Sequence, residues 1–277
     1  MKLIQHLSIL ALISLPRLGL AAQDSDLRPL IDDSTLAAQL GAVGMIVAGD
    51  ARTSLSLASG FMISPCHVLT AAHALARPGN KVKIGMSVKF FPKGKIGRIV
   101  ASEVWGRVVA ADPDFVMSAA APGFNPQLIA RDWSLIELDR PLPEIEPLKL
   151  LFPGSKIDNS AHFSIVGYPM GSGLIGLHAQ ERCAAWSGHD TINISGLLIA
   201  DCAVRPGMSG GPLLLEGNDQ ALVAGIVVER VEIGRKVMTV AVPSAIFAES
   251  VVTAMRESEV CAVGSPFALP PRTPGTP

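Results

Sequence analysis

A single serine stands among glycines in the stretch Gly207-Met208-Ser209-Gly210-Gly211-Pro212. Glycines have no Cβ, so the backbone amides beside them can approach another carbonyl closely. A serine hydroxyl is a weak nucleophile at its own pKa, and it needs a base within hydrogen-bond reach and a third group that orients the base. The stretch therefore predicts nucleophilic chemistry at Ser209, provided that the chain supplies the other two groups.

The order of these groups along the chain separates two possible folds. The stretch also fits Gly-x-Ser-x-Gly, the nucleophile elbow of α/β-hydrolases, in which the acid and then the histidine follow the serine. No histidine follows Ser209 in this sequence. The elbow interpretation is therefore excluded, and the base must come from the part of the chain before the serine.

The histidine that best fits a catalytic base is His73, at the end of Leu69-Thr70-Ala71-Ala72-His73. Its small neighbours follow a predicted strand and can form a tight turn with little bulk around the imidazole. His67 lies inside that strand, and we interpret it as structural. A metal site made of His73 with His67 or Cys66 would need a second ligand pair at zinc-like spacing, which the sequence lacks. We therefore predict no metal and no cofactor.

The third group is Asp132, which opens the run Asp132-Trp133-Ser134-Leu135-Ile136-Glu137-Leu138. An acid at the start of a strand can be shielded from water while the strand fixes its position. Asp112, Asp114 and Asp139 lie instead in turn sequences flanked by proline, where aspartate usually serves the turn itself. We therefore select Asp132 as the acid that supports His73.

Short apolar runs rich in Val and Ile fill the chain between about residues 42 and 242, and turn residues separate them. Many short strands of this kind are typical of an all-β sandwich or barrel. A composition with 49% hydrophobic and 17% charged residues, 26 Gly and 21 Pro fits a folded protein with many turns. The predicted strands lie at 43–47, 61–63, 82–91, 96–100, 135–138, 162–166, 197–199, 213–215, 221–228 and 237–242.

One segment, residues 244–257, has helical spacing instead. Ser244 is a candidate N-cap after Pro243, and apolar residues recur every three or four positions from Ile246 to Met255. We expect the apolar stripe of this helix to dock on the β-structure rather than on a membrane or a partner.

The two ends of the chain have their own composition. Lys2, an apolar run over residues 7–15 and small residues up to Ala22 predict a signal peptide over residues 1–22. This run falls far short of the roughly 20 residues of a spanning helix, so we expect no membrane anchor after cleavage. Residues 23–41 are predicted to be a leader or propeptide arm, and residues 262–277 a Pro-rich tail.

The number of cysteines bears on the disulfides, and the net charge bears on the possible partners. The chain has four cysteines, and an even number in an exported chain predicts two disulfides. Of the three possible pairings we favour Cys183 with Cys202, because a strand and a turn can bring them together, which leaves Cys66 with Cys261. The formal net charge of −1 does not favour a nucleic-acid partner.

The motifs at 69–73, 132–138 and 207–212 together resemble the three signatures of trypsin-like serine proteases, in that family's His, Asp, Ser order. The resemblance covers residues 42–257. It implies two six-stranded antiparallel β-barrels, at 42–147 and 148–243, with the active site between them. The run at 202–209 resembles bacterial secreted proteases related to glutamyl endopeptidase.

This resemblance implies a secreted or periplasmic serine endopeptidase, which we expect to be a monomer acting on protein or peptide substrates. It implies an acyl-enzyme mechanism in which the backbone amides of Gly207 and Ser209 form the oxyanion hole. Met208 replaces the aspartate that precedes the serine in animal digestive enzymes, so a catalytically silent, protease-like binding module is the alternative.

The resemblance also implies a specificity pocket with Ala203 and Val204 at its base and Val227 and Val228 along its wall. Apolar walls predict a small or medium apolar substrate side chain, because burying an unpaired charge is costly. Arg205 or Arg230 could instead reach in and favour an acidic side chain. The edge at 228–230 resembles the segment that binds substrate backbone by strand addition, and its side chains fit a plain barrel strand equally well.

Overall fold

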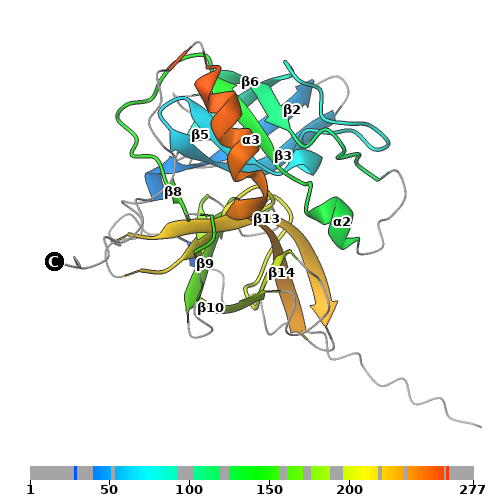
Figure 1. Cartoon of the computed structure of the whole chain (residues 1–277), viewed down its shortest axis with the longest axis vertical. Coiled ribbons are helices and arrows are strands. Elements are labelled where there is room, and N and C mark those ends of the chain that lie inside the picture. Colours follow the sequence, from blue (N-terminus) through cyan, green and yellow to red (C-terminus); the bar gives the residue numbers. More distant parts are fainter. Residues whose placement is uncertain are drawn as a thin grey trace, which may run out of the picture.

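Two β-structures, one above the other in Figure 1, contain most of the described chain. The computed structural model describes residues 28–29, 40–50, 54–92, 103–118, 125–151, 153–155, 157, 161–170, 176–187, 196–217, 220–233, 236–258 and 260–261. The predicted signal peptide, the strand predicted at 96–100 and the Pro-rich tail lie outside these residues. None of the helices in the described part is long and apolar enough to cross a bilayer.

The first β-structure is a closed barrel with strand order β2-β3-β4-β7-β6-β5, in which every neighbouring pair is antiparallel. Alternate residues face its core, as in β6, where Val104, Gly106 and Val108 are buried and the residues between them are exposed. The predicted first barrel is therefore confirmed. Its strands are β2 (Val43–Asp50), β3 (Ser54–Ser64), β4 (His67–Thr70), β5 (Ser87–Pro92), β6 (Val104–Ala111) and β7 (Ser134–Leu138).

The second β-structure is a curled sheet with the path β1-β10-β11-β14-β13-β12-β9, in which β10 also pairs with β9. Strand β8 (Lys149–Leu150) pairs with β13 in parallel, which departs from the all-antiparallel prediction. We call this structure the second sheet. Its other strands are β1 (Arg28–Pro29), β9 (His162–Gly167), β10 (His178–Ser187), β11 (Leu198–Ala200), β12 (Pro212–Leu215), β13 (Leu222–Ile233) and β14 (Lys236–Pro243).

Several boundaries differ from the sequence prediction. The strand predicted to begin at residue 82 begins at Ser87, because a turn closed by the Met86 N–H on the Lys83 carbonyl and a positive φ of 81° at Gly85 precede it. The apolar run did not reveal this turn. Strand β1 falls in the predicted leader arm, where Arg28 and Pro29 pair with the edge of β10.

The C-terminal helix α3 (Ser244–Arg256) packs against strands of both β-structures, β6 in the barrel and β13 and β14 in the second sheet. The docking prediction is confirmed: Phe247 and Val251 are fully buried, and the Phe247 ring lies 6.0 Å from that of Trp133. The N-cap is Pro243 rather than Ser244, because Ser244 is already helical and its hydroxyl donates to the Leu151 carbonyl at 3.1 Å.

Both disulfides have the favoured pairing, Cys66 with Cys261 and Cys183 with Cys202. The first ties the chain after α3 to the turn between β3 and β4. Beside it, the buried Glu137 carboxylate accepts hydrogen bonds from Ser258 at 2.5 Å and from Arg107 at 2.8 Å. Burial raises the pKa of Glu137, but these two contacts outweigh it and hold the pKa below its ordinary value.

Candidate active site

Strand pairing in the barrel brings His73 and Asp132 together. His73 lies in the short 3-10 helix η2 (Ala72–Ala74) just after β4, and Asp132 lies just before β7. Because β4 and β7 are antiparallel, with Thr70 opposite Ser134, the end of one strand meets the start of the other. The two side chains therefore leave the same edge of the barrel.

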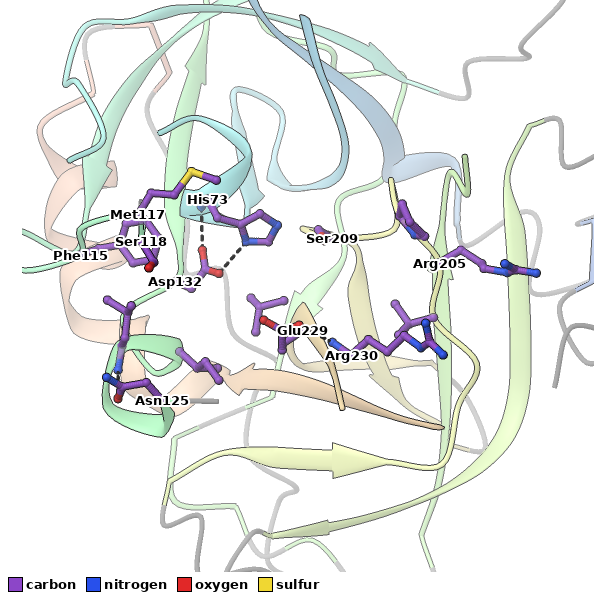
Figure 2. Close-up of a pocket in the computed structure, with 15 residues that line it drawn as sticks. His73, Phe115, Met117, Ser118, Asn125, Asp132, Arg205, Ser209, Glu229 and Arg230 are labelled. Atoms are coloured by element: carbon purple, nitrogen blue, oxygen red, sulfur yellow. Dashed lines mark hydrogen bonds and ion pairs between the residues drawn. The ribbon is translucent and has the colours of Figure 1, made fainter. Parts of the chain in front are cut away.

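Both carboxylate oxygens of Asp132 accept hydrogen bonds from His73 (Figure 2). Oδ2 lies 2.6 Å from the ring Nδ1, and Oδ1 accepts from the His73 backbone N–H at 2.8 Å. A carboxylate acceptor requires the proton on Nδ1, which leaves the lone pair of Nε2 available as a base. The Asp132 side chain is 9% exposed and that of His73 29%, so the ring remains accessible.

Charge around the imidazole controls its basicity. Burial lowers the pKa of His73, but the charge of Asp132, the hydrogen bond to it and the carboxylate of Glu229 outweigh burial and raise the pKa above its ordinary value. His73 is therefore a stronger base than a free imidazole.

Ser209 lines the same cavity as His73 and Asp132. Its loop is tied to the barrel by the Ser59 N–H, which donates to the Ser209 carbonyl at 2.8 Å, and Gly210 must be glycine because a Cβ there would collide with Ser59 O and Thr70 Oγ1. Within the described residues the Ser209 hydroxyl has no hydrogen bond to His73, and Figure 2 shows it across a gap from the ring. Contacts of this kind often tighten only when substrate binds.

Two backbone amides of the serine loop have no acceptor in the part of the chain that the structure describes. Among the described residues, no acceptor takes a hydrogen bond from the N–H of Gly207 or of Ser209, whereas the Met208 N–H donates to the Arg205 carbonyl at 3.0 Å. Gly207 has a φ of 89°, and a Cβ there would collide with the Tyr168 carbonyl. Met208 is buried in the apolar core of the second sheet. The loop thus presents two free donors beside the serine.

The cavity beside these residues has a volume of about 350 Å³ and mostly apolar walls. One wall comes from the second sheet and the other from the barrel side, where α2 (Pro126–Ile129) supplies Leu128 and Ile129. The remaining lining residues are Phe115, Met117, Ser118, Asn125, Val204, Arg205, Pro206, Val228, Glu229 and Arg230.

Of the four residues expected in the specificity pocket, Val204 and Val228 line this cavity. Ala203 and Val227 are buried and do not line it. Both backbone groups of Val227 are used in holding the serine loop, since its N–H donates to Gly211 O at 2.9 Å and its carbonyl accepts from Gly210 N at 2.7 Å.

Sequence reasoning missed the wall on the barrel side. Asn125 caps α2 through its side chain, and Pro126 is the first helical residue, so the Asn-Pro pair could have predicted this helix. Nothing in the sequence indicates that Phe115, Met117 and Leu128 meet beside His73, because the fold alone brings them there.

Charged side chains lie at the second-sheet side of the cavity. The Glu229 carboxylate accepts from the Arg230 N–H at 3.1 Å, while the Arg230 guanidinium pairs with Glu232 at 2.9 Å. Figure 2 shows Glu229 on the side of Arg230 that faces the His73–Asp132 pair, and Arg205 with its guanidinium directed away from Ser209.

His67 has the environment of a structural histidine. It is fully buried, its Nδ1 lies 2.8 Å from Ser64 Oγ, and burial, which the charge of Glu137 only partly offsets, lowers its pKa. Among the described residues no group of three or more His, Cys, Asp or Glu side chains could hold a metal ion.

Comparison with known proteins gives a family and a fold. A family model described as a trypsin-like peptidase domain matches residues 58–226, a range that includes His73, Asp132 and Ser209. No curated protein matches the chain.

Two solved structures are similar. A thermostable serine protease, AL20, from an extremophilic microorganism has a TM-score of 0.59 and 14% identity over 78% of this chain and 98% of that one. A Glu endopeptidase in complex with MPD has a TM-score of 0.57 and 16% identity over 83% and 96%. At these identities the likeness shows a shared fold, which is the chymotrypsin-like fold.

Proposed function

Because this chain belongs to the trypsin-like peptidase family and is a serine-type endopeptidase, we propose that His73, Asp132 and Ser209 are its catalytic triad. The observation that carries the proposal is the His73–Asp132 pair, joined by two hydrogen bonds, in the same cavity as Ser209. Each of the three groups comes from a separate motif, and the acid holds the base in the tautomer that the reaction needs.

The proposed reaction forms and then hydrolyses an acyl-enzyme. His73 Nε2 takes the Ser209 proton as Oγ attacks the peptide carbonyl carbon, and Asp132 stabilises the imidazolium. In this proposal, the N–H groups of Gly207 and Ser209, which have no acceptor among the described residues, bind the oxyanion of the tetrahedral intermediate. The amine leaves with the proton from His73, and a water molecule, deprotonated by the same nitrogen, then releases the acid product and restores Ser209.

The apolar cavity supports a preference for substrates with an apolar side chain beside the scissile bond, because Val204, Val228 and Leu128 offer no partner to a charge. The alternative preference for an acidic side chain has less support, since Arg230 is already paired with Glu232 and the half-buried Glu229 adds negative charge to the cavity. Sequencing the products cleaved from a peptide library tests this preference.

We further propose that the protein is exported and acts on protein or peptide substrates, either in the periplasm or outside the cell. Two disulfides within the described chain support this compartment, because such bonds persist in oxidising surroundings. Detection of the mature chain in the secreted or periplasmic fraction, with an N-terminus after residue 22, tests it.

Labelling with a fluorophosphonate probe tests the triad. The wild type should be labelled, Ser209→Ala should not, and Ser118→Ala is the matched control, because it removes another hydroxyl from the same cavity. A correctly processed wild type that resists the probe would instead favour a protease-like binding module without activity. Labelling that survives in Ser209→Ala would assign the nucleophile elsewhere.

A further inference from the structure

Ser59 of the barrel contacts residues 205–211 of the second sheet, which we call the nucleophile loop. It lies in the middle of β3 and is fully buried. Its hydroxyl donates to the Gly207 carbonyl at 2.8 Å and accepts from the Tyr168 N–H at 2.9 Å. These partners lie 148 and 109 residues away along the chain, so one side chain joins two distant segments of the second sheet to the barrel.

The backbone of Ser59 is engaged at the same place. Its N–H donates to the Ser209 carbonyl at 2.8 Å, and its own carbonyl accepts from Thr70 Oγ1 at 2.7 Å. Ser59 therefore binds the carbonyls of Gly207 and Ser209, the residues on either side of Met208. A hydrogen bond to a buried carbonyl is costly to lose, because the carbonyl has no water to replace it.

These contacts fix the peptide groups around Gly207. The peptide before it is held by the Met170 N–H, which donates to the Pro206 carbonyl at 2.7 Å. The peptide after it is held at its carbonyl by Ser59 and at its N–H by Arg205. Gly207 is in the left-handed region with a φ of 89°, where glycine leaves the backbone free to rotate unless neighbours restrain it. With these restraints in place, the N–H groups of Gly207 and Ser209 meet no acceptor among the described residues.

No charged anchor is present at the residue before the serine. Met208 is 1% exposed and packs in the apolar core of the second sheet, so it cannot form an ion pair that would order the loop. Ser59 supplies directional bonds that an apolar side chain lacks. We propose that Ser59 is a positioning residue, which holds the amides of Gly207 and Ser209 in the arrangement that binds the oxyanion. This inference rests on the proposed function, because it assigns those amides a part in the reaction.

Ser59→Ala removes the hydroxyl and leaves the Gly207 carbonyl and the Tyr168 N–H without this partner. Deleting one oxyanion-hole donor in a serine protease costs about 10²- to 10³-fold in kcat. Ser59 acts through the loop, so we expect kcat to fall about 10- to 100-fold while KM changes less than about threefold.

Ser64→Ala is the matched control. Ser64 is a second buried serine of β3, and its hydroxyl also contacts two partners, the His67 ring and the Cys66 N–H, neither of which belongs to the nucleophile loop. It should retain kcat to within about threefold, even if its melting temperature falls as far as that of Ser59→Ala.

Amide hydrogen exchange of the segment 205–211 gives a readout that does not require activity. Ser59→Ala should exchange at least about tenfold faster than wild type there, and Ser64→Ala should not. An unchanged kcat, a fall shared by Ser64→Ala, or a fall without faster exchange would each overturn the proposal. A wild type that does not react with the fluorophosphonate would refute the proposed function, and exchange alone would then decide whether Ser59 orders the loop.

Discussion

Asp132→Asn should inactivate the protein by fixing the wrong tautomer of His73. One oxygen of Asp132 accepts from the His73 backbone N–H at 2.8 Å, and the other faces Nδ1 at 2.6 Å. In the variant the amide oxygen must occupy the first position, since an NH₂ group cannot accept the backbone N–H. The NH₂ group then faces Nδ1 and donates to it. The ring proton moves to Nε2, which can no longer take a proton from Ser209.

The magnitude follows from the charge that is lost. A carboxylate and an imidazolium whose charge centres are about 4 Å apart interact by about 4 kcal/mol at an effective dielectric constant of about 20. At about 1.4 kcal/mol for each factor of ten, this loss alone corresponds to a rate reduction of about 10³. The tautomer adds to it, and the corresponding substitution in another triad lowers kcat about 10⁴-fold. We expect kcat/KM to fall by about 10³ to 10⁴.

The assay compares kcat/KM for a peptide substrate, and the rate of fluorophosphonate labelling, across wild type, Asp132→Asn and Asp139→Asn. Asp139 is exposed, and its substitution removes the same charge outside the cavity, so activity should stay within about threefold. Circular dichroism must show that Asp132→Asn is folded. A folded Asp132→Asn variant that loses less than tenfold would refute the assignment of Asp132 as the orienting acid.

Three further outcomes are expected. Glu229→Gln removes a carboxylate that raises the pKa of His73, so the acidic limb of the pH profile of kcat/KM should move to lower pH. An unshifted limb would show that Glu229 does not affect the pKa of His73. Replacing both cysteines of the Cys66–Cys261 pair, 195 residues apart, should lower the free energy of unfolding by about 5 kcal/mol, against about 3 kcal/mol for the Cys183–Cys202 pair, 19 residues apart; equal losses in urea titrations would contradict this order. Because the pKa of Glu137 is lowered in the folded state, its ionised carboxylate stabilises the fold at pH values above the ordinary carboxylate pKa. This stabilisation is lost as the pH falls through the folded pKa, so Glu137→Gln should flatten the acid side of the plot of unfolding free energy against pH.

Much of the fold and of the site was predictable because its signals are local. A short, mainly apolar run bounded by polar and turn residues, such as residues 135–138, indicates a strand. The His73 and Asp132 motifs lie at the end of one strand and the start of another, and antiparallel pairing of β4 and β7 then brings them together. The helix at the C-terminus was equally clear, because its apolar spacing needs no tertiary context.

The rest of the site depends on contacts between distant segments. Ser59 is one of four serines in β3, and its sequence neighbourhood does not distinguish it from a strand serine with no special role. Its partners Tyr168 and Gly207 lie in the second sheet. The cavity wall at Phe115 and Leu128 could not be predicted for the same reason, since in the sequence each residue fits an ordinary core position equally well.

The site is divided between two β-structures, so a change that separates them should affect His73 and Ser209 differently. His73 and Asp132 belong to the barrel, so their pairing needs only β4 and β7 to stay joined. Ser209 belongs to the second sheet, and its position relative to the ring depends on the contact of Ser59 with the nucleophile loop. A change that weakens the contact between the two β-structures should therefore leave the His73–Asp132 pair in place and displace Ser209. Reactivity of Ser209 should be lost before the raised pKa of His73 returns to its ordinary value, because the charge and hydrogen bond of Asp132 raise this pKa from within the barrel and only the smaller effect of Glu229 comes from the second sheet.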